Sequence, residues 1–176
     1  PAAVGMSVLS KPLLFVITTP EIALGGYMIT PFVCLGALFM GMYGITNNIL
    51  ILEKNTRILG KLWILVAIVN VLLNILLVPC LGIIGAALAT LLCYVLAFVV
   101  TAYESKKTMR LPFNKKEVLK IVISSIIMGI VVYLMNANDL ISILITIVVG
   151  VIVYFASIFA LKGISKKEIE LFKNLI

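Results

Sequence analysis

A few polar side chains lie within otherwise apolar stretches of the sequence, where they could bind a ligand. Lys11 stands among apolar residues near the start of the chain. A lysine in that setting either binds an anion inside a cavity or extends its ammonium group to water. Asn70 and Asn74 are four residues apart and therefore share one helix face. Together with Thr30 and Asn47 they could line a polar path for a sugar-bearing ligand, or simply form hydrogen bonds between helices.

Patterns for catalysis, cofactor binding or metal binding are missing from the sequence. It contains no histidine, which excludes a His-based triad or a histidine metal site within this chain. Its three cysteines, Cys34, Cys80 and Cys93, lack C-x-x-C spacing, and we interpret them as small apolar residues. No phosphate-binding loop or nucleophile–base pair is present. We therefore predict a protein that is not an enzyme and that has no catalytic residues, cofactor or metal.

The composition shows which solvent must surround these residues. The chain has 176 residues, of which 63% are apolar and 12% charged, and its mean hydropathy is +1.26. Soluble domains carry about 25% charged residues, and a small soluble domain cannot bury so many apolar side chains. The sequence therefore predicts an all-α, polytopic transmembrane helix bundle and excludes both a soluble enzyme and a disordered chain.

Long charge-free runs indicate where the chain crosses the membrane, since a crossing needs about 20 apolar residues. Gly25 and Gly26 are expected in a loop, and residues 79–82 in a tight turn. The chain begins without Met, as though a helix were already under way, so we expect it to be the C-terminal part of a longer protein. The predicted helices cover residues 1–18 (incomplete), 27–52, 62–78, 83–103, 118–136 and 140–161, which together form a transmembrane region over 1–161.

The basic residues predict the orientation of these helices. All but one of the 14 lysines and arginines fall on alternate connections, namely 54–61, 106–120 and the tail from 162. The opposite connections contain only Lys11. This asymmetry follows the positive-inside rule and places the basic loops and the C-terminus in the cytoplasm. We therefore attribute the net charge of +7, Arg57 included, to topology and expect no nucleic-acid partner.

The tail at residues 162–176 combines lysines with an apolar stripe. Ser165 and Glu168 have the spacing of a capping box, which indicates that a short helix begins there. Ile169, Phe172 and Ile176 would share one face of that helix. We predict a cytoplasmic amphipathic helix that lies on anionic lipid, and binding to a partner protein is the alternative.

Small residues and one proline suggest close packing and a flexible span. Pro31 lies inside the 27–52 run, so this helix could kink as a moving transporter requires. Small residues spaced four apart let neighbouring helices approach closely. The pairs are Ala37 with Gly41, Gly82 with Ala86, and Gly85 with Ala89.

Residues 69–92, VNVLLNILLVPCLGIIGAALATLL, resemble the hallmark of the MATE-like (MOP) transporter superfamily. The likeness is greatest to the polysaccharide branch, the flippases for lipid-linked oligosaccharides. Residues 1–26 are similar to the same branch, whereas residues 104–176 match only in layout. The resemblance implies that the motif shapes a tight helical hairpin. The motif residues concerned are Pro79, Gly82, Gly85, Ala86, Ala87, Ala89 and Thr90.

The resemblance also implies a function. Members have two lobes that rock around a central cavity, and this chain would be most of the C-terminal lobe with two further helices. Its partners would be the N-terminal lobe, membrane lipids and an undecaprenyl-diphosphate-linked oligosaccharide, which it would export across a bacterial plasma membrane. Lys11 is the candidate cation for the diphosphate, with Thr30, Asn47, Asn70 and Asn74 as further cavity candidates.

Other functions stay open at this point. A lipid II flippase would share the same layout. A cation-coupled multidrug antiporter has its acidic residue in the N-terminal lobe, so its absence here does not exclude that branch. The two further helices predicted after Tyr103 favour a flippase over a drug exporter, which has fewer helices. A membrane scaffold or membrane enzyme would require loop motifs that this sequence lacks.

Overall fold

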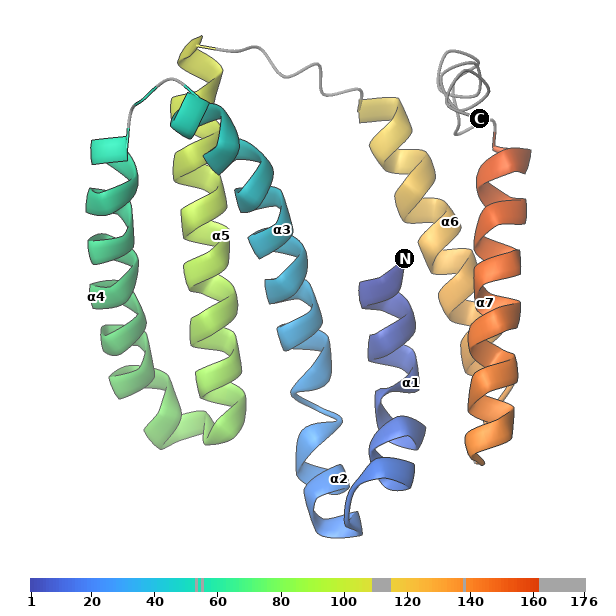
Figure 1. Ribbon diagram of the computed structural model, residues 1–176. Helices are drawn as coiled ribbons and strands as arrows, with labels where there is room; N and C mark the ends of the chain where they lie inside the picture. Colours follow the sequence, from blue (N-terminus) through green and yellow to red (C-terminus); the bar gives the residue numbers. More distant parts are fainter. Residues whose placement is uncertain (53, 55, 109–114, 138, 162–176) are drawn as a thin grey trace. The chain divides into compact units, whose positions relative to one another are not determined.

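The computed structural model describes residues 1–52, 54, 56–108, 115–137 and 139–161. Within these residues all regular structure is helical (Figure 1), and five helices are long and apolar enough to cross a membrane. The predicted tail helix at 162–176 lies outside the described residues. The helices are α1 (Ala2–Ile17), α2 (Pro20–Gly26), α3 (Thr30–Leu52), α4 (Thr56–Leu81), α5 (Ile83–Thr108), α6 (Lys115–Leu134) and α7 (Leu140–Ala160).

The long helices contain the charge-free runs, but α4 begins at Thr56 and α5 ends at Thr108, so both continue beyond the predicted bounds into the basic segments. Other differences occur at glycine and proline. A short helix, α2, occupies the connection expected to be a loop, and it begins at Pro20. Proline is favoured in the first turn of a helix because its fixed φ suits that position and no N–H is needed there. Pro31 is the second residue of α3, so it lies in the first turn, where proline is tolerated, and not in the helix interior. Pro79 lies within the last turn of α4 rather than after it.

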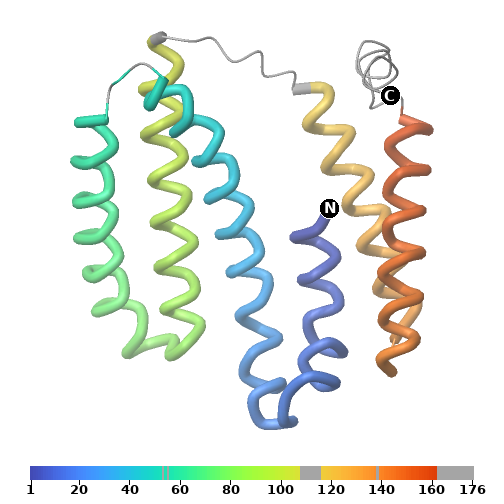
Figure 2. Tube along the Cα trace, in the orientation of Figure 1, coloured from blue at the N-terminus to red at the C-terminus, as the bar shows by residue number. Residues whose placement is uncertain are grey.

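The chain divides into two compact units, residues Pro1–Ala23 with Phe113–Ile176 (unit 1) and residues Leu24–Pro112 (unit 2). In unit 2, α3 and α4 both pack against α5, as Figure 2 shows along the chain trace. Small side chains on α5 make this possible. Cys93 and Ala97 are almost fully buried and contact Leu62, Val66 and Tyr43. These residues form the core of unit 2.

In unit 1, α6 and α7 form a hairpin against which α1 packs. Leu9 of α1 is buried with Met128 and Val132 of α6. Glycines again allow the close approach. A Cβ placed on Gly129 would lie 2.8 Å from Cγ1 of Val4, and one on Gly150 would lie 3.0 Å from Cγ2 of Val132.

The corner between α4 and α5 is turned by Gly82. Its φ is +58°, a left-handed conformation that glycine adopts without steric cost. The Gly82 N–H donates to the carbonyl oxygen of Val78 at 2.8 Å, and the Gly85 N–H donates to the carbonyl oxygen of Gly82 at 3.0 Å. A Cβ on Gly85 would overlap the backbone carbonyl of Leu77. The tight hairpin expected from the motif is therefore present, and Gly85 is the residue that lets the two helices meet.

Large apolar side chains cover the outside of both units. Ile75 and Leu76 of α4 are 64% and 67% exposed, and Ile152 of α7 is 61% exposed. Exposure of so many aliphatic side chains is stable in hydrocarbon and costly in water. The exposed surface thus fits a multi-pass membrane protein.

Substituting Gly85 with alanine should lower the stability of the protein by about 1–3 kcal/mol, because the new methyl group meets a fixed backbone carbonyl. Alanine favours the helical conformation over glycine by at most about 1 kcal/mol, which does not offset the cost of this overlap. Gly60→Ala is the matched control, because open space surrounds its Cβ position. Thermal unfolding in detergent, followed by circular dichroism, compares the two. Equal melting temperatures for both variants would contradict the close approach at Gly85.

Candidate functional site

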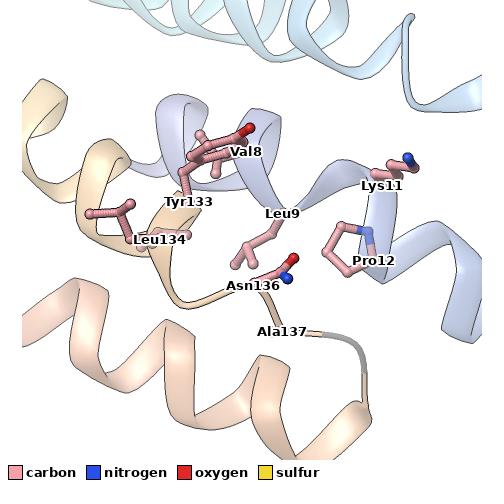
Figure 3. A pocket seen from close by; sticks show the side chains of 9 residues that line it. Val8, Leu9, Lys11, Pro12, Tyr133, Leu134, Asn136 and Ala137 are labelled. Atoms are coloured by element: carbon pink, nitrogen blue, oxygen red, sulfur yellow. The ribbon is translucent and has the colours of Figure 1, made fainter.

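Lys11 lines a cavity of about 560 Å³ in unit 1, together with Tyr133, Asn136 and six apolar residues. The cavity lies between α1 and the end of α6, and Figure 3 shows Lys11 and Pro12 on one side with Tyr133 and Asn136 on the other. Its size is typical of small-ligand sites. The full lining consists of Val8, Leu9, Lys11, Pro12, Val132, Tyr133, Leu134, Asn136 and Ala137.

The α1 wall of this cavity is shaped by a proline inside the helix. Pro12 has no N–H, so the carbonyl of Val8, four residues earlier, loses its usual helical donor. Val8 and Pro12 both line the cavity. Nearby hydroxyl groups bond within the helix instead, with Ser7 Oγ donating to the carbonyl oxygen of Ala3 at 2.7 Å and Ser10 Oγ to that of Ser7 at 2.8 Å.

The opposite wall is the C-terminal end of α6. Asn136 has φ +42°, and asparagine tolerates this left-handed region better than most residues. Its N–H donates to the carbonyl oxygen of Tyr133 at 3.4 Å. Tyr133 is 75% exposed. Beyond this turn, Asp139 is the N-cap of α7, and its N–H donates to Oγ of Ser142 at 3.0 Å.

Asn70 and Asn74 are half-buried on α4 and take part in the packing of unit 2. The Asn74 amide donates to the backbone oxygen of Asn70 at 2.8 Å and to its Oδ1 at 3.1 Å. The Asn70 amide donates to Sγ of Cys93 on α5 at 3.5 Å. Cys93 in turn donates to the carbonyl oxygen of Val66, at 3.7 Å. The Asn70–Cys93 and Cys93–Val66 contacts join α4 to α5, whereas the Asn74 contacts lie within α4.

Asn47 also belongs to a network between helices. Its Oδ1 accepts a hydrogen bond from the Tyr43 hydroxyl at 3.1 Å, and that hydroxyl accepts one from the Trp63 indole N–H at 2.8 Å. The two rings meet edge to face with centroids 5.5 Å apart. Thr30 bonds locally, with its hydroxyl donating to the carbonyl oxygen of Gly26 at 3.1 Å.

A buried pair of threonines joins α3 to α5. Thr46 and Thr101 are 2% and 0% exposed, and their hydroxyl oxygens are 2.7 Å apart. Thr46 was recognisable as a polar residue in an apolar run, but nothing in the sequence indicated Thr101 as its partner. The pairing depends on the register of two helices, which the sequence pattern leaves undetermined.

The motif residues at the start of α5 line a second cavity, of about 420 Å³, in unit 2. Ala86, Ala87 and Thr90 face Gly36 and neighbouring residues of α3 there. The Thr90 hydroxyl donates to the carbonyl oxygen of Ala86 at 3.0 Å, while Ala89 is fully buried. This cavity has apolar walls and no charged residue among its lining.

The cavity at Lys11 therefore has the most varied polar chemistry among these sites. Within the residues that the structure describes, no three His, Cys, Asp or Glu side chains come together as a metal site would require. Sequence reasoning singled out Lys11 but missed Val8, Tyr133 and Asn136. Two features of the sequence could have indicated this place. Pro12 lies inside an apolar helix, where it removes a backbone hydrogen bond, and Asn136 lies just past the end of a helix, where asparagine can adopt a left-handed conformation.

Comparisons with known proteins relate this arrangement to a transporter. The fold matches that of the lipid II flippase MurJ in its inward closed conformation, with a TM-score of 0.76 and 29% sequence identity over 89% of this chain. This likeness supports a relationship to the MATE-like (MOP) flippases, without indicating a branch of that superfamily. An uncharacterized membrane protein of Methanocaldococcus jannaschii is 32% identical over 139 residues, or 77% of this chain. No protein-family model matches the chain.

The chain spans 27% of the length of the Methanocaldococcus relative and 34% of that of the flippase. Both proteins are thus considerably longer than the region they share with this chain. The polysaccharide branch, expected from residues 69–92, stays a prediction.

Replacing Asn74 with alanine should lower stability by about 1 kcal/mol, since one intramolecular hydrogen bond is lost. In a double-mutant cycle with Asn70→Ala, the two effects should be non-additive by at least roughly 0.5 kcal/mol, because the side chains contact each other. Unfolding in detergent measures both quantities. Asn48→Ala, at an exposed position of α3, is the control and should change stability by less than about 0.5 kcal/mol. Unchanged stability with lost transport in Asn74→Ala would instead indicate a ligand contact.

Proposed function

We propose that this chain is the C-terminal portion of a membrane flippase that exports undecaprenyl-diphosphate-linked oligosaccharide across a bacterial plasma membrane by alternating access. The observation that carries the proposal is the likeness to a lipid II flippase over 89% of the chain with a TM-score of 0.76. In this proposal the basic loops and the C-terminus are cytoplasmic, as the positive-inside pattern predicts.

A lipid-linked oligosaccharide requires polar groups of the protein along its path through the membrane. A diphosphate carries negative charge and a glycan carries many hydroxyl groups, and both are costly to expose to hydrocarbon. A path between protein lobes replaces their water with polar side chains. Lys11 lines a cavity in unit 1, and it is our candidate for the contact with the diphosphate.

A lipid II flippase is the second candidate, and the named function of the matched structure favours it. Lipid II and lipid-linked oligosaccharides share the prenyl diphosphate and differ in the attached sugars. The part of the site that recognises phosphate would therefore serve either cargo. Neither of the two proteins compared above is named as a multidrug antiporter.

Deleting the intact gene should abolish surface polysaccharide and cause its lipid-linked precursor to accumulate inside the cell. Complementation with Lys11→Ala should reduce export by at least about tenfold, because a charge-assisted contact of roughly 1.5–3 kcal/mol is lost. Lys11→Arg should retain export, and Lys61→Ala, an exposed lysine of α4, is the control. Surface glycan and the precursor pool are measured in parallel.

The same experiment separates the rival functions. Accumulation of lipid II together with lysis would assign the lipid II cargo instead. Unchanged glycan with new sensitivity to cationic drugs would contradict the flippase and favour the antiporter.

A further inference from the structure

We propose that the cavity at Lys11 holds the first sugar of the lipid-linked glycan on the outer side of the membrane, with Tyr133 and Asn136 as the residues that contact the sugar. The inference rests on the proposed function, in which Lys11 contacts the diphosphate, and it assigns residues to the part of the cargo beyond the phosphates. Three observations carry it: two polar side chains of the cavity without internal partners, the mixed character of the lining, and the place of the cavity at one end of unit 1.

The Tyr133 hydroxyl and the Asn136 side-chain amide are available to a ligand. Among the residues that the structure describes, neither group forms a hydrogen bond within the protein, and both side chains are exposed. The asparagines singled out from the sequence differ in this respect, because the side chains of Asn47, Asn70 and Asn74 bond to other groups of unit 2. Tyr133 and Asn136 therefore contribute no hydrogen bond to the packing, and a ligand in the cavity can use both groups.

The lining of the cavity matches the two kinds of surface that a sugar presents. A pyranose ring has faces of C–H groups and an edge of hydroxyl groups. A tyrosine ring offers an apolar face with a hydroxyl at its tip, and an asparagine amide both donates and accepts hydrogen bonds. Both side chains line the cavity together with Lys11 (Figure 3), and none of the described lining residues carries a carboxylate that would repel the diphosphate. A volume of about 560 Å³ is in the range of small-ligand sites and leaves room for a sugar beside the phosphates.

The cavity lies at the end of unit 1 that the predicted topology assigns to the outer side. Lys11 is six residues before the end of α1, and Tyr133 is next to the last residue of α6. The connections that follow these two helices, residues 18–19 and 135–139, contain no lysine or arginine, whereas basic connections mark the cytoplasmic side. A sugar bound here has therefore already crossed the hydrocarbon core, and the site belongs to the outward half of the transport path.

The test measures ligand binding to the intact gene product in detergent by native mass spectrometry. Farnesyl-diphosphate-linked N-acetylglucosamine is compared with the methyl ester of farnesyl diphosphate, which has the same charge and no sugar. The sugar-bearing ligand should bind at least about tenfold more tightly, since it adds a hydrogen bond to Asn136 and a contact with the Tyr133 ring.

Substitutions at the two contact residues remove the sugar contacts without disturbing the fold. Asn136→Gly removes the amide and keeps the turn, because glycine adopts the left-handed φ of +42° without steric cost, and it should reduce the preference for the sugar-bearing ligand about fivefold. Tyr133→Leu should reduce this preference by a similar factor, and its exposed position tolerates the change. Tyr133→Phe, which keeps the ring, should retain most of the preference. Tyr103→Leu, at another exposed tyrosine near a helix end, is the matched control and should leave it unchanged.

Lys11→Ala separates the sugar contact from the diphosphate contact. This variant should bind both ligands about tenfold more weakly and leave the ratio of their affinities unchanged. Equal affinity of the wild type for the two ligands would overturn the sugar site and leave the diphosphate contact of the proposed function in place. A preference for the sugar that survives both Asn136→Gly and Tyr133→Leu would also overturn it. Binding of both ligands that does not depend on Lys11 would overturn the diphosphate contact and the sugar site together.

Discussion

In hydrocarbon no water is present to pair with the backbone, and every N–H and carbonyl must find its partner within the protein. The rest of this structure follows from that constraint. The described chain is helical wherever it is regular, and hydroxyl groups such as those of Ser7 and Thr146 donate to carbonyls of their own helices. Departures from the helical pattern occur at few places. Two of them, at Pro12 and Asn136, line the same cavity.

Small residues determine how the helices of each unit meet. In a membrane, association gains little from burying apolar surface, since lipid is apolar as well, so close packing and hydrogen bonds contribute more. Gly85 brings α4 to α5, and Gly129 brings α6 to α1. Once the backbones are close, the Thr46–Thr101 contact and the Asn70–Cys93 contact become possible. Polar pairing in unit 2 is therefore a consequence of the small-residue packing.

The sequence predicted the long helices well because charge and hydropathy change sharply at membrane boundaries. The tight hairpin at Gly82 and the close approach at Gly85 were also predictable from the motif. Pro31 and Pro79 were harder, since a proline near a helix end can be tolerated or can end the helix, depending on one or two residues of register. Asn70 was recognisable as polar, but its partner Cys93 depends on the rotation of α4 against α5. The cavity at Lys11 needed two segments far apart in the sequence, α1 and the end of α6, and no local pattern brings them together.

The hydrogen bond between Trp63 and Tyr43 has a practical consequence. Trp63 is the single tryptophan of the chain, so its fluorescence originates from one place, the contact between α4 and α3. Its indole N–H is 2.8 Å from the Tyr43 hydroxyl, and the tyrosine ring lies 5.5 Å away. Separation of the two helices would expose the indole to a different polarity and shift its emission wavelength. The chain thus contains an intrinsic optical probe of helix movement in unit 2, for which no label has to be attached.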